Sequence, residues 1–213
     1  MNIIAHRGYW LLPEEKNTLV AFDRALENNF GIETDVREYR GQLVLSHDIA
    51  DEASISFDEL LEIYVDKASQ SVLALNVKED GIQNMVQDLL TRRRVLNYFF
   101  FDMSVPEMVI YRKKNMPYFT RNSDIEHDPV LLEDAAGVWI DAFYDNWDMI
   151  KSIKKYLNQG KSVSLISPEI HGKNKKGLWD ELKKEEINNY DSFHLCTDQP
   201  AEARSYFMEG NEL

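Results

Sequence analysis

Residues 17–36 read NTLVAFDRALENNFGIETDV, a helix pattern followed at once by a strand pattern. Asn17-Thr18 favours a helix start, and apolar residues then recur at the helical spacing Leu19, Phe22, Leu26 and Phe30. The segment 31–36 is rich in β-forming residues and predicts a strand. This succession of helix and strand is the pattern that decides the fold.

The same alternation continues along the whole chain. Arg40-Gly41 predicts a hairpin turn, and Ser56-Phe57-Asp58-Glu59 is typical of a helix start closed by a capping box. Further strands are expected at 2–5, 42–45, 71–77, 97–101, 118–120, 137–141, 161–166 and 192–196, with helix patterns between most of them. Strands that alternate with helices favour a parallel sheet.

About eight principal strands, most followed by a helix, predict an α/β fold of the (β/α)₈ TIM-barrel type. No linker divides the chain, so we expect a single domain of residues 1–213. The open, doubly wound alternative requires a glycine-rich turn after the first strand. The chain has only His6-Arg7-Gly8 there, which makes this alternative weaker.

Composition narrows the class of function. Acidic residues outnumber basic ones by 37 to 24, for a formal charge of −13, which disfavours nucleic acid and anionic membranes as partners. One cysteine cannot form an internal disulfide, and the N-terminus lacks a signal-peptide pattern. We therefore expect a cytoplasmic protein without a membrane partner; its oligomeric state is left open.

Two carboxylates, Glu33 and Asp35, lie two residues apart on one predicted strand and so share a face. Burying both charges without a partner is unfavourable. A bound cation is the first explanation, most plausibly Mg²⁺ or Ca²⁺ because these ions prefer oxygen ligands. Arg37 or Lys78 as a structural partner is the alternative.

Two histidines follow neighbouring strands beside this pair. His6 ends the first predicted strand, and His47 follows the strand at 42–45. Histidine is the side chain best suited to proton transfer near neutral pH. Polar groups at the carboxyl ends of strands also match the position of active sites in α/β barrels.

The chain resembles the glycerophosphodiester phosphodiesterase family. The resemblance rests on His6-Arg7-Gly8, Asn17-Thr18 with Ala21-Phe22, Glu33-Thr34-Asp35-Val36, His47-Asp48 and the closing Thr197-Asp198-Gln199-Pro200. It is dense over the first 48 residues and thin between about 80 and 190. It implies a TIM barrel, a divalent cation and a pair of catalytic histidines.

By position, His6 and His47 match the family's acid/base pair, and Glu33 and Asp35 match two metal ligands. Arg7 and Lys78 match basic residues that contact the phosphate. The third metal ligand of the family is a glutamate, and the matching position here is Asn76. An amide oxygen can still coordinate a hard cation, but it adds no charge.

With two further departures, the chain looks like a divergent branch of the family. Lys16 stands where the family usually has glutamate, and the stretch 167–172 contains Glu169 and His171. We expect Glu169 to compensate for the missing carboxylate and His171 to contact the substrate. Pairing of Glu169 with Lys173 is the alternative.

The expected function is metal-dependent hydrolysis of a small phosphodiester of glycerol or a sugar. One histidine accepts the proton of the nucleophile and the other protonates the leaving alkoxide. Water and a neighbouring substrate hydroxyl both remain possible nucleophiles. Two other hypotheses stay open: a catalytically lapsed barrel that binds a phosphorylated saccharide or a partner, and an aldolase that uses Lys78 as a Schiff-base nucleophile.

Overall fold

A computed structural model describes residues 1–67, 69–144 and 147–208. The predicted domain of residues 1–213 therefore includes positions outside the described residues. The chain forms two compact units: an N-terminal unit of residues 5–118, and a C-terminal unit of residues 1–4 and 119–213. The first strand, β1 (Asn2–His6), contributes residues to both.

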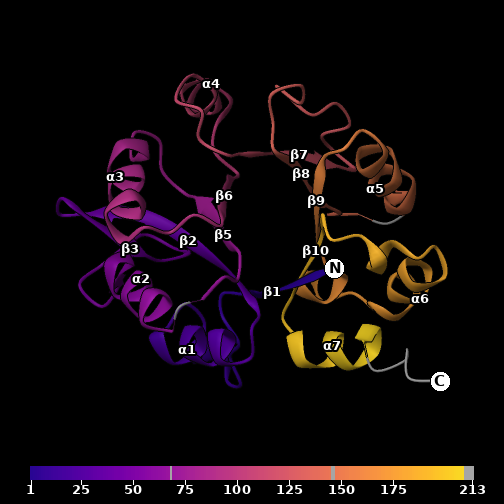
Figure 1. The fold of residues 1–213 in the computed structure, drawn as a ribbon, viewed down its shortest axis with the longest axis horizontal. Coiled ribbons are helices and arrows are strands. Elements are labelled where there is room, and N and C mark those ends of the chain that lie inside the picture. The colour runs from indigo at the N-terminus through magenta and orange to yellow at the C-terminus, as the bar shows by residue number, and fades with distance from the viewer. Residues whose placement is uncertain (68, 145–146, 209–213) are drawn as a thin grey trace. The chain divides into compact units, whose positions relative to one another are not determined.

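The N-terminal unit has a mixed sheet built around β2 (Gly31–Tyr39). Parallel strands β5 (Leu73–Val77) and β6 (Tyr98–Phe101) follow β2 in the order β2-β5-β6 (Figure 1). On its other ladder β2 pairs with the antiparallel β3 (Gln42–Leu45), and β3 pairs with the short β4 (Ile55–Ser56). The β2–β5 register places Asp35 opposite Asn76.

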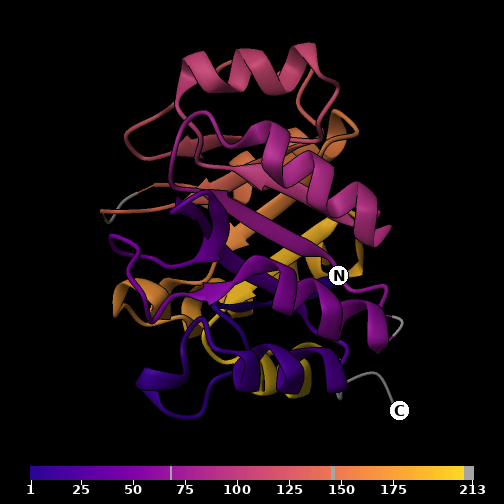
Figure 2. The ribbon, with the colours of Figure 1, turned by 90° about the vertical axis from the view of Figure 1, so that its left-hand side faces the viewer.

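The helices of this unit are α1 (Leu19–Glu27), α2 (Phe57–Asp66), α3 (Gln83–Arg93) and α4 (Val105–Lys113), and a short 3₁₀ helix, η1 (Pro13–Glu15), precedes α1. Figure 2 shows α1, α2 and α3 one above another, and each packs on the next. The N-termini of α1, α2 and α4 are capped by side chains. Thr18 accepts from Ala21, Ser56 and Glu59 form the expected capping box, and Ser104 accepts from Glu107.

The C-terminal unit repeats the βα pattern with parallel strands in chain order. These are β7 (Phe119–Ser123), β8 (Gly137–Asp141), β9 (Ser162–Ile166) and β10 (Phe193–Thr197). The helices are α5 (Met149–Asn158), α6 (Lys176–Lys184) and α7 (Pro200–Met208), with 3₁₀ helices η2 (Pro168–His171) and η3 (Ile187–Asn189). Strands β8 and β10 are buried along their whole length, as expected when both faces of a parallel sheet are covered.

The predicted α/β class is confirmed, since each predicted strand and most predicted helices are present. Closure of the strands into a barrel, and a single domain, stay predictions. Three local differences matter: β4 was not expected, β7 continues beyond Thr120 to Ser123, and β2 extends to Tyr39. Glu33 and Asp35 therefore lie within β2 rather than at its end. None of the helices in the described residues has the length and apolar character needed to cross a membrane.

Gly137 at the start of β8 shows how closely the strands of the C-terminal unit pack. A Cβ at this position would lie 2.6 Å from the carbonyl oxygen of Ser162 and 2.5 Å from the ring of Phe119. Contacts this short require either the strand or the ring to move, so glycine is needed at this position for steric reasons.

We expect Gly137→Ala to destabilise the protein by about 1–3 kcal/mol, because the added methyl group overpacks a filled region. Gly177→Ala in α6 is the matched control, since a Cβ there meets nothing within 4 Å. The control should gain up to about 1 kcal/mol from helix propensity. Urea unfolding of both variants checks this, and equal stabilities would contradict the packing argument.

Candidate active site

Glu33 and Asp35 are the chemical centre of the N-terminal unit. They are 2% and 1% exposed, and their alternation along β2 directs both side chains to one face of the sheet. Two acidic side chains so deeply buried must be neutralised by protons, cations or hydrogen-bond donors. The surrounding residues supply more cations and hydrogen-bond donors to Asp35 than to Glu33.

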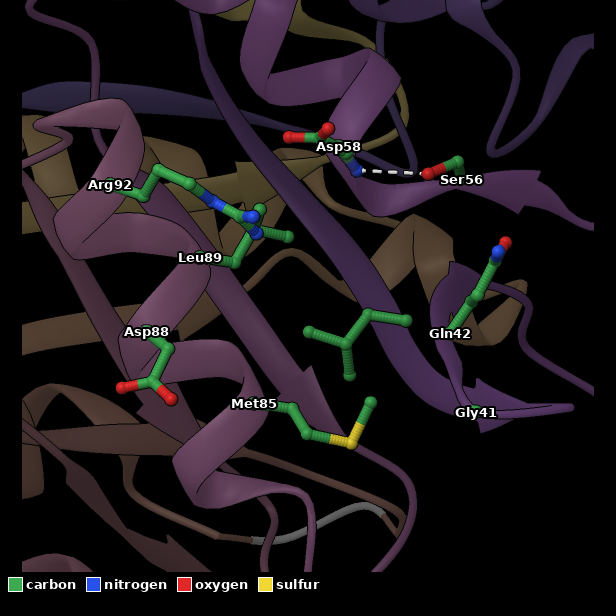
Figure 3. Close-up of a pocket in the computed structure, with 9 residues that line it drawn as sticks. Gly41, Gln42, Ser56, Asp58, Met85, Asp88, Leu89 and Arg92 are labelled. Carbon is green, nitrogen blue, oxygen red and sulfur yellow. Dashed lines mark hydrogen bonds between the residues drawn. The ribbon is translucent and has the colours of Figure 1, made fainter.

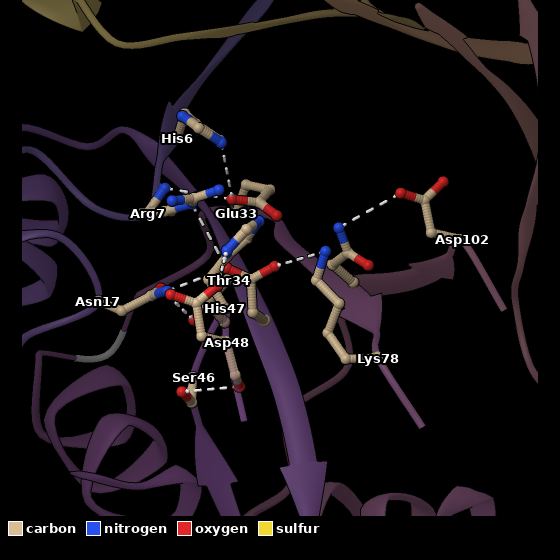
Figure 4. Close-up of polar contacts among 12 residues, drawn as sticks. His6, Arg7, Asn17, Glu33, Thr34, Ser46, His47, Asp48, Lys78 and Asp102 are labelled. Atoms are coloured by element: carbon tan, nitrogen blue, oxygen red, sulfur yellow. Dashed lines mark hydrogen bonds and ion pairs between the residues drawn. The ribbon is translucent and has the colours of Figure 1, made fainter. Parts of the chain in front are cut away.

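The His6-Arg7-Gly8 turn brings the first donors to Glu33. Arg7 and Gly8 both have left-handed backbone, with φ of 56° and 87°. A Cβ on Gly8 would lie 2.8 Å from Cβ of Ala21, so the turn fits closely against α1. The turn directs the Arg7 backbone N–H to Oε2 of Glu33 at 3.2 Å, and Nε2 of His6 lies 3.9 Å from the same oxygen (Figure 4).

Asp35 is held by two cationic side chains and an amide. Nζ of Lys78 lies 3.1 Å from Oδ1, Nε of Arg7 lies 3.4 Å from Oδ2, and Nδ2 of Asn17 donates to Oδ2 at 3.0 Å. Burial opposes ionisation, but Lys78, the Asn17 hydrogen bond and Arg7 together hold the pKa of Asp35 below its usual value. Lys78 is thus a partner of the carboxylate pair, as the structural alternative predicted.

Glu33 is less well compensated than Asp35. Burial, reinforced by the negative charge of Asp35, raises the pKa of Glu33 well above its usual range. The nearby Arg7 and Lys78 oppose this shift without cancelling it. The site therefore favours a proton or an additional positive charge at Glu33.

Arg37 positions His47 and does not act as the carboxylate partner that the sequence allowed. Its guanidinium donates to three backbone carbonyls, those of Ser46 at 3.2 Å, Lys78 at 3.3 Å and His47 at 3.0 Å. These hydrogen bonds connect the segment after β3 with the end of β5. His47 is about half exposed, and its Nδ1 lies 2.9 Å from Oδ1 of Asp48.

Asn76 completes the set of oxygen donors near the carboxylates. It is 7% exposed, and its Nδ2 donates to Oδ2 of Asp102 at 3.3 Å. Its Oδ1 is buried and accepts no hydrogen bond. A buried carbonyl oxygen without a donor is uncommon in proteins and suits a cation.

Glu33, Asp35 and Asn76 are therefore the residues that could hold a hard cation. Within the described residues no three His, Cys, Asp or Glu side chains form a metal-binding group, because the third donor here is an amide. Two carboxylates and a free amide oxygen still fit the chemistry of Mg²⁺ or Ca²⁺. The poorly compensated Glu33 gives the same indication.

The other two predicted site residues belong to the C-terminal unit. Glu169 accepts hydrogen bonds from the hydroxyls of Ser167 and Thr197, and His171 lies 2.7 Å from Oδ1 of Asp141 through Nε2. The hydrogen bond to Asp141 raises the pKa of His171. Compensation of Asn76 by Glu169 and a substrate contact by His171 stay predictions.

One cavity in the N-terminal unit lies away from these groups, and another, smaller one lies beside them. A cavity of about 620 Å³ is bounded by the β2–β3 turn, the start of α2 and one face of α3 (Figure 3). Its lining contains neither histidine nor lysine. The smaller cavity, of about 300 Å³, is lined by Arg7, Asn17, His47 and their neighbours. Of these two cavities, the smaller one therefore adjoins the candidate site, because Arg7 and His47 belong to its lining.

Sequence reasoning missed the roles of three residues. Asn17 was assigned to the helix start, but it binds Asp35 and accepts from Thr34 at 2.8 Å. Arg37 was considered only as a partner of the carboxylates, and Asp102 was not placed in the site. The position of Asp102 directly after β6, next to the strand that carries Asn76, is the signal that could have found it.

Comparisons with known proteins establish the fold. No family model and no curated protein sequence matches the chain. A solved structure from Galdieria sulphuraria, provisionally assigned as a glycerophosphodiester phosphodiesterase, matches with a TM-score of 0.76 and 18% identity over 97% of both chains. A phosphodiesterase from Oleispira antarctica, in complex with the product sn-glycerol-3-phosphate, gives 0.71 and 16% over 97% of this chain and 96% of its own.

A third structure supports the same likeness. The glycerophosphodiester phosphodiesterase of Agrobacterium tumefaciens str. C58 matches with a TM-score of 0.67 and 18% identity, over 94% of this chain and 97% of that chain. At these identities the comparisons show a shared fold. The chain thus has the fold of glycerophosphodiester phosphodiesterases along nearly its whole length.

The raised pKa of Glu33 predicts a pH-dependent stability in metal-free protein. The native state holds a proton that the unfolded state releases near pH 4.5, so the parent should lose stability as pH rises through the native pKa. Glu33→Gln removes this loss, and its stability relative to the parent should increase between about pH 5 and about pH 8. Urea unfolding with a chelator measures it, with the exposed Glu181→Gln as control. An unchanged difference at the two pH values would contradict the assignment.

Proposed function

We propose that this chain is a divalent-cation-dependent glycerophosphodiester phosphodiesterase with a two-histidine mechanism. One observation carries the proposal. On the fold of known phosphodiesterases, one unit gathers His6 and two cationic side chains around a buried carboxylate pair, with His47 lining the adjoining cavity. The Oleispira antarctica relative, solved with sn-glycerol-3-phosphate, supports glycerol 3-phosphate as the product here as well.

Glu33, Asp35 and Asn76 would hold the cation, which would supply positive charge against the phosphate oxygens when bound. Arg7 and Lys78 neutralise Asp35 in the metal-free chain. When the carboxylates coordinate the cation, Arg7 and Lys78 become available to bind the phosphate. They then stabilise the charge that increases on the equatorial oxygens during attack.

His6 and His47 would carry the two proton transfers. One accepts the proton of the attacking hydroxyl as the new phosphorus–oxygen bond forms. The other donates a proton to the alcohol oxygen as its bond to phosphorus breaks. The hydrogen bond between the indole N–H of Trp10 and the carbonyl of His6, at 3.2 Å, steadies the backbone of the first histidine. Attack by water gives the phosphomonoester directly, and attack by a substrate hydroxyl gives a cyclic phosphate first.

A lapsed enzyme that binds a phosphorylated ligand is the second candidate. It is favoured by Asn76, which leaves the site with two carboxylates, and by the ion pairs that already neutralise Asp35. The aldolase hypothesis loses support, because Nζ of Lys78 is engaged by Oδ1 of Asp35 at 3.1 Å, whereas a Schiff-base lysine must be open to a carbonyl carbon. Small soluble phosphodiesters in the cytoplasm remain the expected substrates.

We expect His6→Ala and His47→Ala each to lower kcat by about 10²–10⁴-fold, the usual contribution of a general acid or base. Both variants should unfold in urea like the parent. His127→Ala in the loop after β7 is the control and should keep the parent rate. Parent-like turnover by both active-site variants would exclude the acid/base assignment.

Removal of divalent cations should abolish hydrolysis, and Mg²⁺ or Ca²⁺ should restore it, because the carboxylates need the cation for phosphate chemistry. The assay is release of sn-glycerol-3-phosphate from a panel of glycerophosphodiesters that differ in their alcohol. Full activity after exhaustive chelation would disprove the metal requirement. Binding of sn-glycerol-3-phosphate without hydrolysis of any member of the panel would favour the lapsed binder.

A further inference from the structure

The contact between Asn76 and Asp102 is a polar feature of the site that the mechanism above does not use. Asn76 is on β5, next to Phe101 in the β5–β6 register, and Asp102 follows directly. Nδ2 of Asn76 donates to Oδ2 of Asp102 at 3.3 Å. Figure 4 shows Asp102 at the opposite side of the site from His6 and Arg7.

This contact fixes which end of the Asn76 amide is available. The Asp102 oxygen accepts this hydrogen bond, so it selects the orientation in which Nδ2 of Asn76 faces it. Oδ1 of Asn76 is then left buried and without a donor, although the side chain is more than nine-tenths buried. A carbonyl oxygen held in this way is an available ligand for a hard cation.

The backbone of Asp102 is also unusual. Its φ is +64°, in the left-handed region that L residues rarely adopt and that Asp tolerates better than most. Arg7 and Asn17, which both contact Asp35, share this conformation with φ of 56°. Three of the nine non-glycine residues with positive φ in the described part of the chain therefore lie at the site.

Charge gives a further reason to place Asp102 in the site. Glu33 and Asp35 offer two negative charges, and Asp35 already faces Lys78 and Arg7. Asp102 adds a third carboxylate within hydrogen-bond distance of the neutral donor Asn76. A neutral ligand and an adjoining carboxylate together can replace one charged ligand.

The geometry points to Asp102 as a positioning residue of the cation site. It holds Nδ2 of Asn76 so that Oδ1 is available to the cation. Its carboxylate also places beside Asn76 the negative charge that this neutral ligand lacks. This inference rests on the cation of the proposed function. It also removes the need for Glu169 as the compensating carboxylate.

The test is a titration of the whole chain with Mn²⁺. Electron paramagnetic resonance measures the concentration of free Mn²⁺, and Mg²⁺ serves as the competitor. Asp102→Asn keeps a group that can accept from Asn76 but removes the charge. It should weaken Mn²⁺ binding about 10–100-fold, as expected for the loss of a group that supports a metal ligand. The matched control is Asp80→Asn, which removes a nearby exposed carboxylate that accepts from Ser104 at 2.6 Å. It should bind Mn²⁺ like the parent.

The double variant Asn76→Asp with Asp102→Asn keeps the hydrogen bond, reverses its direction and moves the carboxylate to the ligand position. It should regain most of the affinity that Asp102→Asn loses. This recovery distinguishes a lost charge from a damaged fold, because a misfolded single variant would not be rescued by a second change.

Parent-like Mn²⁺ binding by Asp102→Asn overturns the inference and leaves the proposed function standing if the parent hydrolyses its substrate. Loss of affinity in Glu169→Gln but not in Asp102→Asn overturns it in favour of Glu169. Mn²⁺ binding that depends on Asp102 in a protein that hydrolyses no phosphodiester supports the inference and rejects the proposed function. Absence of Mn²⁺ binding by the parent rejects both the cation and the role of Asp102.

Discussion

The burial of two carboxylates on one face of β2 is the constraint that organises the N-terminal unit. Glu33 and Asp35 lie among apolar strand residues where water cannot solvate them, so the surrounding chain must supply their counter-charges. The left-handed turn at Arg7, the position of Lys78 after β5 and the amide of Asn17 all meet this need. Acidic residues outnumber basic ones in this chain, so two cationic side chains beside one carboxylate pair stand out from the overall composition.

The unequal neutralisation of the pair gives the site its chemical character. Asp35 is surrounded by cations and donors, whereas Glu33 has a backbone N–H and the nearby imidazole of His6. Environments that shift the pKa values of two neighbouring carboxyl groups in opposite directions are typical of functional sites. A folded core that served stability alone would gain more from apolar residues at these two positions.

Much of the fold could be predicted because its signals are local. The helix caps at Thr18 and Ser56 and the hairpin turn at Arg40-Gly41 depend on neighbouring residues, and the structure confirms them. The length of β2 could not be predicted, because residues 37–39 form a strand only through pairing with β3. Closure of the barrel depends on contacts between distant strands, about which local patterns carry no information.

The candidate site likewise contains residues that local patterns predict and residues that only tertiary contacts reveal. Side chains that follow predicted strands, such as His6 and Lys78, lie at the carboxylate pair, because strand ends of a parallel sheet meet at one edge. Arg37 was one of two alternatives for a partner of the carboxylates. Its contacts are instead with backbone carbonyls, which sequence patterns do not predict. Asp102 required the β5–β6 register, which only the structure provides.

The β2–β3 hairpin has a consequence for how the site can change in evolution. Its tight turn pairs Val36 with Leu45, and the N–H of Ser46 donates to the carbonyl of Asp35 at 3.0 Å. The chain between Asp35 and His47 is therefore a spacer of fixed length. One added residue would shift the strand register and turn the side chains of one strand to the opposite face. An insertion between Asp35 and His47 is therefore expected to move the histidine relative to the carboxylate pair, whereas loops outside this spacer can change length without doing so.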